Sequence, residues 1–233
     1  MEDPETKPRL PFSLCKRVID ATYDVRYFEE SLATLSKCAL VCREWRPHAQ
    51  MKFFDNVIVR NRTLLSQLES LLSESPHLRG YVHRLTLRGY LHVTDSPAVL
   101  FPRVVRDWMP NLTHVYLQEI PPEEEAETSP PANMSKTPLP LHPIFPTLLR
   151  TLDHVRQVDL VGLRFHSFGD LCRVIGALRG LTGLVCDNVS WDVFCNLPYS
   201  VSRAISSAQD GNDRKPFLPK LCVLNVGPRL TCL

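Results

Sequence analysis

One short apolar pattern recurs along most of the chain and limits the folds that the chain can adopt. An apolar residue is followed, after two variable positions, by a second apolar residue and, after one more, by a third. Spacing of this kind buries one face of a β-strand. All copies but the last follow a stretch with apolar residues at helical spacing, so helices and strands alternate, which favours parallel strands joined by helices. The clearest copies are Leu112-x-x-Val115-x-Leu117, Val155-x-x-Val158-x-Leu160 and Leu221-x-x-Leu224-x-Val226, and related strands are predicted over 82–87 and 181–186.

The predicted helices between these strands have apolar stripes and recognisable ends. The first stripe covers 64–72, where Asn61 or Thr63 can cap the helix and Ser75-Pro76 ends it. Further stripes predict helices over 100–108, 144–152 and 168–178.

The recurring strand resembles the strand half of a leucine-rich repeat, whose apolar positions enter a continuous core between stacked strands and stacked helices. The spacing is irregular, with 30 residues from Leu85 to Val115 and 26 from Val158 to Leu184. We therefore expect an irregular α/β leucine-rich-repeat-like solenoid over 60–233, with an ordinary parallel α/β sheet as the alternative. The last strand is followed by Leu230-Thr231-Cys232-Leu233 without a polar capping element, which predicts an incomplete array, either a truncated gene model or one that a partner covers.

Two segments interrupt the array. Residues 121–140 are acidic and rich in proline, with almost no large apolar side chain, so they cannot offset their own ordering entropy and are predicted to form a disordered loop. A docking peptide for a proline-recognising domain is the alternative for this loop. Residues 206–219 predict a second exposed loop.

Composition excludes several classes of partner. The 27 basic and 25 acidic residues leave a net charge of +2, without the global basic field that nucleic-acid or anionic-membrane binding needs. No apolar stretch approaches the length of a membrane span, and the N-terminus lacks the features of a signal peptide. We expect an intracellular protein, in the cytoplasm or the nucleus, whose eight cysteines are free thiols.

No motif in the chain predicts catalysis. There is no G-x-S-x-G, no H-E-x-x-H and no glycine-rich phosphate loop. Cys38 and Cys42 lie one helical turn apart, but no second pair at zinc-site spacing accompanies them, so neither a metal nor a cofactor is predicted. A cysteine hydrolase built from distant Cys and His residues is the remaining enzymatic alternative. We expect a protein that is not an enzyme.

The first part of the chain has a different pattern of apolar and polar residues from the predicted repeats. Residues 1–9 are polar and predict a flexible N-terminus. Residues 10–59 contain three bursts of apolar residues at helical spacing and then a short apolar strand over 56–59, which predicts a small module of three helices. The overall fold class is therefore α+β.

The motifs of this module resemble an F-box. They are Leu10-Pro11-x-x-Leu14 with Val18-Ile19-Asp20, then Leu35-x-x-Cys38-Ala39-Leu40-Val41-Cys42-Arg43-x-Trp45, and finally Phe53-Phe54. They are most similar to the F-box proteins that mushroom-forming fungi encode in large numbers, and 163–171 and Val189-Ser190-Trp191 resemble the carboxy-terminal parts of those proteins.

The resemblance implies a docking surface for a Skp-type adaptor of a cullin-RING ubiquitin ligase. A helical module of this size leaves one apolar face exposed, and that face docks on the adaptor. Trp45 is expected to be its main anchor, because a large apolar side chain at the centre of an interface carries much of the binding energy. The residues implied to lie at this contact or directly behind it are Leu10, Pro11, Ile19, Leu40, Val41 and Trp45.

Together these observations predict a non-catalytic substrate-recognition subunit of an SCF-type ubiquitin ligase. The module would hold the adaptor, and the repeat region would bind a target protein on its strands. The alternative is a repeat scaffold with a vestigial F-box and no role in ubiquitin transfer. The candidate target-binding residues are the variable strand positions His83, Arg84, Thr86, His114, Tyr116, Arg156, Gln157 and Asp159.

Overall fold

The chain divides into two units, Met1–Val57 and Ile58–Leu233. The computed structural model combines helices with a parallel sheet, which confirms the mixed fold class. The predicted loop over 206–219 lies outside the described residues. The structure describes residues 11–24, 27–93, 96–120, 137–193, 223–226 and 231–232.

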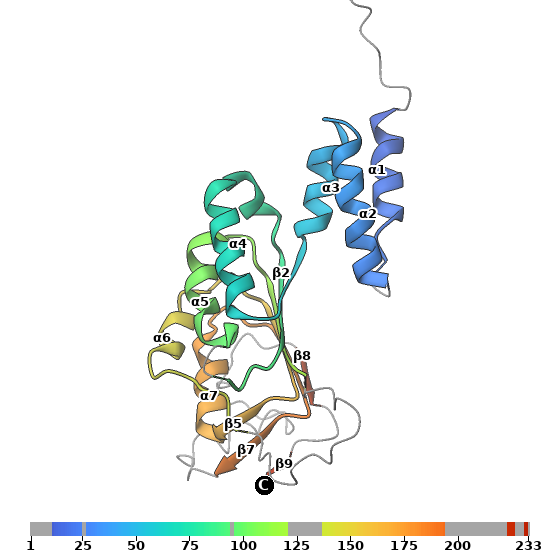
Figure 1. Ribbon diagram of the computed structural model, residues 1–233. Coiled ribbons are helices and arrows are strands. Elements are labelled where there is room, and N and C mark those ends of the chain that lie inside the picture. The colour runs from blue at the N-terminus through green and yellow to red at the C-terminus, as the bar shows by residue number, and fades with distance from the viewer. Residues whose placement is uncertain are drawn as a thin grey trace, which may run out of the picture. The chain divides into compact units, whose positions relative to one another are not determined.

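The first unit contains three helices connected by short segments (Figure 1). They are α1 (Phe12–Ala21), α2 (Phe28–Val41) and α3 (Trp45–Phe54), and β1 (Asn56–Val59) follows them. The chain runs down α1, up α2 and down α3. The start of α1, the end of α2 and the start of α3 therefore lie at one end of this unit (Figure 1).

A small buried cluster holds the three helices together. Ile19 comes from α1, Leu35 and Cys38 come from α2, and Ala49 comes from α3. Ile19, Leu35 and Ala49 are fully buried. Because the cluster is small, each of its side chains accounts for a large share of the stability of the unit. The partly buried side chains packed against it are Tyr23, Leu32, Ala39, Trp45 and Phe53.

Polar contacts at Asp20 also connect α1 to α3. Its Oδ1 lies 3.0 Å from His48 Nε2 and 3.0 Å from Lys52 Nζ. The hydrogen bond from Lys52, helped by that from His48, holds the pKa of Asp20 below its ordinary value, although partial burial acts in the opposite direction. The Asp20 side chain is 46% exposed, so water screens the charges and the contact adds little stability.

The second unit is built on a sheet whose strands follow the order of the chain. The sheet order is β1-β2-β3-β4-β6-β8, and the neighbours from β2 to β8 pair in parallel. A second sheet has the order β5-β7-β9, and its pairs are also parallel. The strands are β2 (Arg84–Gly89), β3 (His114–Glu119), β4 (Gln157–Val161), β5 (Arg164–Ser167), β6 (Gly183–Asp187), β7 (Ser190–Val193), β8 (Val223–Val226) and β9 (Thr231–Cys232).

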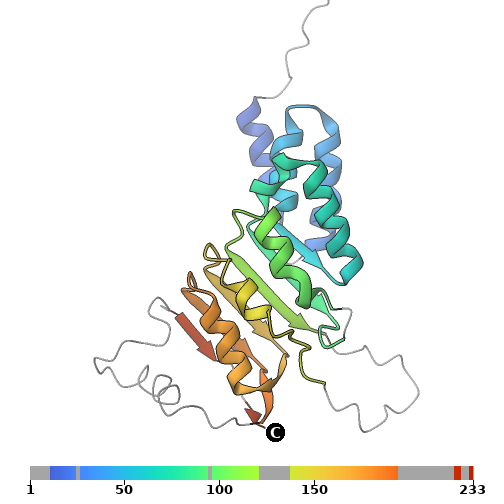
Figure 2. The same ribbon diagram turned by 90° about the vertical axis from the view of Figure 1, so that its left-hand side faces the viewer.

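The helices of this unit cover one face of the larger sheet (Figures 1 and 2). Side chains of Asn61, Ser96 and Ser167 cap α4, α5 and α7 by accepting a hydrogen bond from a backbone N–H in the first turn. Of the two caps expected for the first of these helices, the structure uses Asn61. The helices are α4 (Arg62–Glu74), the 3-10 helix η2 (Pro76–Tyr81), α5 (Pro97–Trp108), α6 (Phe145–Leu149) and α7 (Phe168–Ala177).

The apolar strand positions form continuous buried rows beneath these helices. Leu85 pairs with Val115, Val115 with Val158, and Val158 with Leu184, and all four are buried. The next row behaves in the same way and consists of Leu87, Leu117, Leu160 and Cys186. The irregular spacing of the repeats along the sequence therefore does not disturb the register between the strands.

The strands begin two residues later than the apolar pattern predicts. His83 O accepts hydrogen bonds from Thr113 N (2.9 Å) and His114 N (3.1 Å), and Thr113 O accepts in the same way from Arg156 N and Gln157 N. In each case the carbonyl that accepts two hydrogen bonds lies just before the paired part of its strand begins. The first apolar residues of four patterns are buried but lie ahead of their strands; they are Val82, Leu112, Val155 and Leu181.

The second sheet was not expected from the sequence. After β4 the chain turns at Gly162 (φ 70°), and after β6 it turns at Asn188 (φ 51°), both in the left-handed region that glycine and asparagine tolerate best. Each turn leads into a strand of the second sheet, β5 or β7. An ion pair between Arg164 Nε and Asp192 Oδ1 connects those two strands.

The segment over 121–140, which was predicted to be a disordered loop, differs from that prediction at its C-terminal end. Residues 121–136 lie outside the described residues, but Leu139 is 6% exposed and its N–H donates to Arg164 O at 2.7 Å. Burial of Leu139 and pairing with β5 explain why this end of the segment is held in place. The following helix is also shorter than the predicted 144–152, because the chain turns after Leu149 and buries Leu152 outside the helix.

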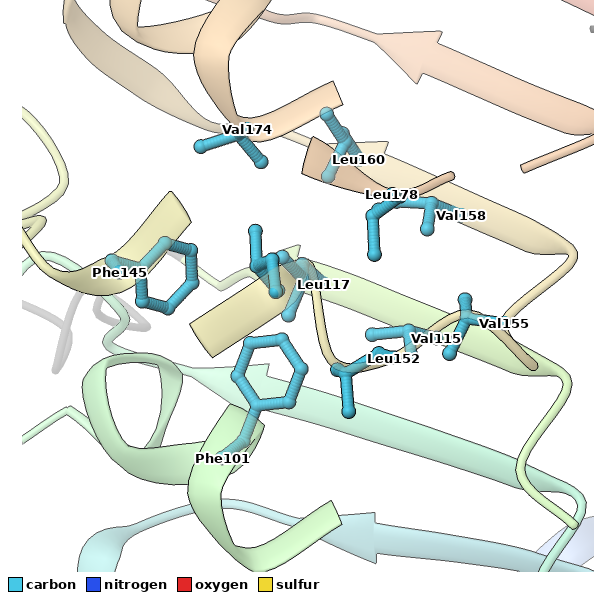
Figure 3. Close-up of a pocket in the computed structure, with 11 residues that line it drawn as sticks. Phe101, Val115, Leu117, Phe145, Leu152, Val155, Val158, Leu160, Val174 and Leu178 are labelled. Atoms are coloured by element: carbon cyan, nitrogen blue, oxygen red, sulfur yellow. The ribbon is translucent and has the colours of Figure 1, made fainter. Parts of the chain in front are cut away.

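A cavity of about 20 Å³ lies between α5, α6, α7 and the strands β3 and β4 (Figure 3). Phe101 and Phe145 face it and contact each other edge to face, with ring centroids 5.9 Å apart. The volume would hold one water molecule, but every lining side chain is apolar, so a water there would lack hydrogen-bond partners and the cavity is expected to stay dry.

Filling the cavity should stabilise the second unit. Val174 lines it from α7, and Val174→Ile adds one methylene without removing a contact. We expect a gain of about 1 kcal/mol, from the apolar surface buried and the cavity volume lost. Val105→Ile is the control, since Val105 is equally buried but does not line the cavity, and overpacking there should be neutral or destabilising. Urea unfolding of both variants checks this prediction. An equal change in the free energy of unfolding in the two variants would contradict it.

Candidate protein-binding surfaces

Large apolar side chains lie exposed on the first unit. Leu40 is 80% exposed and Val41 is 63% exposed at the end of α2. Pro11, Leu14 and Val18 are exposed on or beside α1. The ends of the two helices that carry Pro11, Leu40 and Val41 lie at the same end of the unit (Figure 1). Several large apolar side chains left exposed on one small unit are typical of a protein contact.

The other residues implied by the resemblance differ in accessibility. Ile19 is fully buried in the core of the unit, so it can support a contact only from behind. Trp45 is half-buried and packs against the same core at the start of α3. Trp45 is the first residue of α3, and the start of α3 lies at the same end of the unit as the end of α2 (Figure 1). Leu10 lies outside the described residues.

The face of the larger sheet that α4 to α7 leave uncovered carries most of the predicted target-binding residues. Strand alternation places one row of residues on this face at the start of the strands and a second row two residues further on. The register aligns Arg84, His114 and Gln157 in the first row and Thr86, Tyr116 and Asp159 in the second. Six of the eight predicted residues are therefore brought together.

The remaining two predicted residues lie ahead of the strands. The His83 carbonyl holds the start of β3, as described above. The Arg156 carbonyl accepts from Thr182 N (2.7 Å) and Gly183 N (2.9 Å), and its Nη1 donates to Gly180 O at 3.0 Å. Both residues thus connect neighbouring segments of the sheet.

Asp159 is the centre of a hydrogen-bond network on the uncovered face. Its Oδ2 lies 3.0 Å from His114 Nε2, and its Oδ1 accepts from Gln157 Nε2 at 3.1 Å. Burial by itself would raise the pKa of Asp159, but the hydrogen bonds from His114 and Gln157, with the charge of His114, outweigh burial and lower this pKa. The carboxylate is therefore kept ionised on this surface.

The lowered pKa of Asp159 predicts a pH-dependent contribution to stability. The folded state favours the carboxylate, so the contribution is complete above the unfolded value of 3.8 and is lost as pH falls through the lower folded value. Asp159→Asn should therefore destabilise the second unit by about 1 kcal/mol at pH 7 and by less near pH 2.5. Urea unfolding of the variant and of the unmodified chain at both pH values tests this. The same loss of stability at pH 7 and at pH 2.5 would contradict the prediction. His166→Asn, an exposed residue of β5, is the control.

Tyr116 lies half-buried beside this network. Desolvation raises the pKa of its hydroxyl, as do the charges of Asp159 and Asp187, while Arg88 acts in the opposite direction. The hydroxyl therefore stays protonated at neutral pH and can donate or accept a hydrogen bond.

A third row on this face was missed by the sequence-based prediction. Arg88, Gln118, Val161 and Asp187 are in register at the carboxyl ends of β2, β3, β4 and β6. The predicted strands stopped too early to include them. The period-two pattern extended by two residues could have found them, since each follows a buried position by one residue.

Two of the described cysteines, Cys172 and Cys186, are poor candidates for nucleophiles. Burial raises the pKa of Cys172 to about 11, and burial with the charge of Asp159 raises that of Cys186 to about 11. Thiols are unreactive under these conditions because the thiolate is the nucleophile. Over the described parts of the chain, no three His, Cys, Asp or Glu side chains gather as a metal site would require.

No family model matches the chain, and a search of the curated proteins found no match. None of the helices in the described ranges is both long and apolar enough to cross a membrane.

Proposed function

We propose that the protein is a non-catalytic substrate-recognition subunit of an SCF-type ubiquitin ligase, with an F-box in its first unit and a leucine-rich-repeat-like target-binding region in its second. The observation that carries this proposal is the exposed apolar surface at one end of the three-helix unit, where Leu40 is 80% exposed and Val41 63% exposed. Leaving two such side chains in water is unfavourable unless a partner covers them.

The two units divide the proposed work. The helical unit would dock on a Skp-type adaptor through Pro11, Leu40, Val41 and the exposed part of Trp45. The uncovered sheet face would hold a target protein through polar side chains that stand in regular rows. Such a subunit needs no reactive group, because it acts by raising the effective concentration of target lysines near the charged ubiquitin.

Adaptor capture tests the proposal. The full chain, co-expressed with a fungal Skp-type adaptor, should purify with it in a one-to-one complex. A variant with Leu40→Ala and Val41→Ala should bind at least about thirtyfold more weakly, since loss of an apolar anchor costs about 2 kcal/mol. These two side chains are largely in solvent, so their removal should leave the helices folded.

The matched control is a variant with Leu64→Ala and Leu71→Ala. These leucines of α4 are 39% and 38% exposed, so this variant also removes two exposed apolar side chains, but from the other unit. It should retain adaptor binding. If the intact, folded chain captured no adaptor, the ligase proposal would be refuted and the repeat scaffold without a ubiquitin role would remain.

A further inference from the structure

The charges on the uncovered sheet face are separated by sign. In the third row, Arg88 on β2 and Asp187 on β6 stand at opposite ends, with Gln118 and Val161 between them. Both charged side chains are exposed, and within the described residues neither has an ion-pair partner. Three strand intervals separate them, which is about 14 Å. They are therefore too far apart to neutralise each other.

Each of the other two rows adds one charge, on the side where the third row has the same sign. Arg84, on the same strand as Arg88, adds positive charge at the β2 side. Asp159 on β4 adds negative charge towards the β6 side, where Asp187 stands. Tyr116 lies between the two sides. The charges of Arg88, Asp159 and Asp187 all act on the pKa of its hydroxyl.

We propose that this face binds an extended segment of a target protein that crosses the strands, with an acidic side chain opposite Arg88 and a basic side chain opposite Asp187. This inference rests on the proposed role of the sheet face in target binding. An extended chain advances about 3.4 Å per residue, so the two opposite charges of the segment stand about four residues apart. A segment with two like charges at this spacing is repelled at one end, which gives selectivity.

The uncharged middle of the third row suits the residues between the two charges. Gln118 offers an amide to the backbone of the segment, and Val161 offers an apolar contact. Tyr116, half-buried, presents both ring surface and a hydroxyl.

Selection from a phage-displayed library of random dodecapeptides on the immobilised full chain tests this inference. The unmodified chain should enrich peptides with an acidic and a basic residue four positions apart, in either order. Arg88→Glu makes both ends of the face negative and should enrich peptides with two basic residues at that spacing. Asp187→Lys should enrich peptides with two acidic residues. Each reversal should weaken binding of a peptide selected on the unmodified chain by about tenfold.

Arg103→Glu is the control, because Arg103 is exposed on α5, which covers the opposite face of the sheet, and this reversal should leave selection unchanged. The inference is overturned if the unmodified chain enriches no pair of opposite charges, or if Arg88→Glu enriches the same peptides. Adaptor capture is measured on the same preparations. Capture without charge selection removes this inference alone, whereas charge selection without capture supports the peptide surface and removes the ligase role.

Discussion

Gly180→Ala should destabilise the second unit by about 3 kcal/mol. Gly180 is buried between α7 and β6, where a Cβ would overlap the backbone carbonyl of Asp153 and lie 2.9 Å from Arg156 Nη1. The Arg156 side chain is held because it donates to Gly180 O, and the backbone carbonyl of Arg156 accepts hydrogen bonds from Thr182 N and Gly183 N. The contacted atoms of Asp153 belong to the backbone, which cannot rotate away as a side chain can. Thermal unfolding followed by circular dichroism should show a fall in Tm of about 10 °C.

Gly176→Ala provides the matched control for this prediction. Gly176 lies exposed within α7, four residues before Gly180, where alanine favours the helix. The same change of residue should there stabilise the unit by about 0.5–1 kcal/mol. A similar Tm for both variants would show that the close approach of Asp153 to Gly180 does not limit this turn.

Leu35→Ala should unfold the first unit while the second unit stays folded. Leu35 is fully buried between the three helices, and replacing a buried leucine with alanine costs about 2–5 kcal/mol. A unit with so few buried side chains has little stability in reserve. Hydrogen exchange measured by mass spectrometry should show loss of protection over α1 to α3 and unchanged protection over β2 to β4.

The control for this prediction lies on the same helix. Leu40→Ala removes the same side chain from a site that is 80% exposed, so protection should change little. The pair of variants also separates folding from binding in the adaptor experiment, since Leu35→Ala should lose capture by unfolding and Leu40→Ala by loss of contact. Retained protection in Leu35→Ala would mean that the cluster around Ile19 does not hold the helices together.

Periodicity along the sequence was enough to find the helices and the main strands. The alternation around Val115 and Val158 correctly assigned which side chains point into the core, because strand geometry alone sends every second residue to one face. The variable positions of the same pattern included Thr86, Tyr116 and Asp159, which the register brings together on the other face. The cap at Asn61 could also be predicted, because it depends only on residues close together in the sequence.

Other features depend on residues far apart in the chain, so local patterns could not reveal them. The second sheet exists because turns at Gly162 and Asn188 bring β5 and β7 together, and a single left-handed residue leaves no periodic trace. The charge separation between Arg88 and Asp187 requires the register of four strands.

The helical unit also has features that the sequence predicts and features that only packing decides. Its apolar residues have similar spacing along the sequence, yet Ile19 is buried and Leu40 is exposed. Helical periodicity identifies an apolar face, but only packing against the other two helices decides how much of it is covered. The sequence therefore settled which elements form and which faces are apolar. The tertiary structure settled which apolar and charged side chains remain available to a partner, because that depends on contacts between segments that the sequence holds apart.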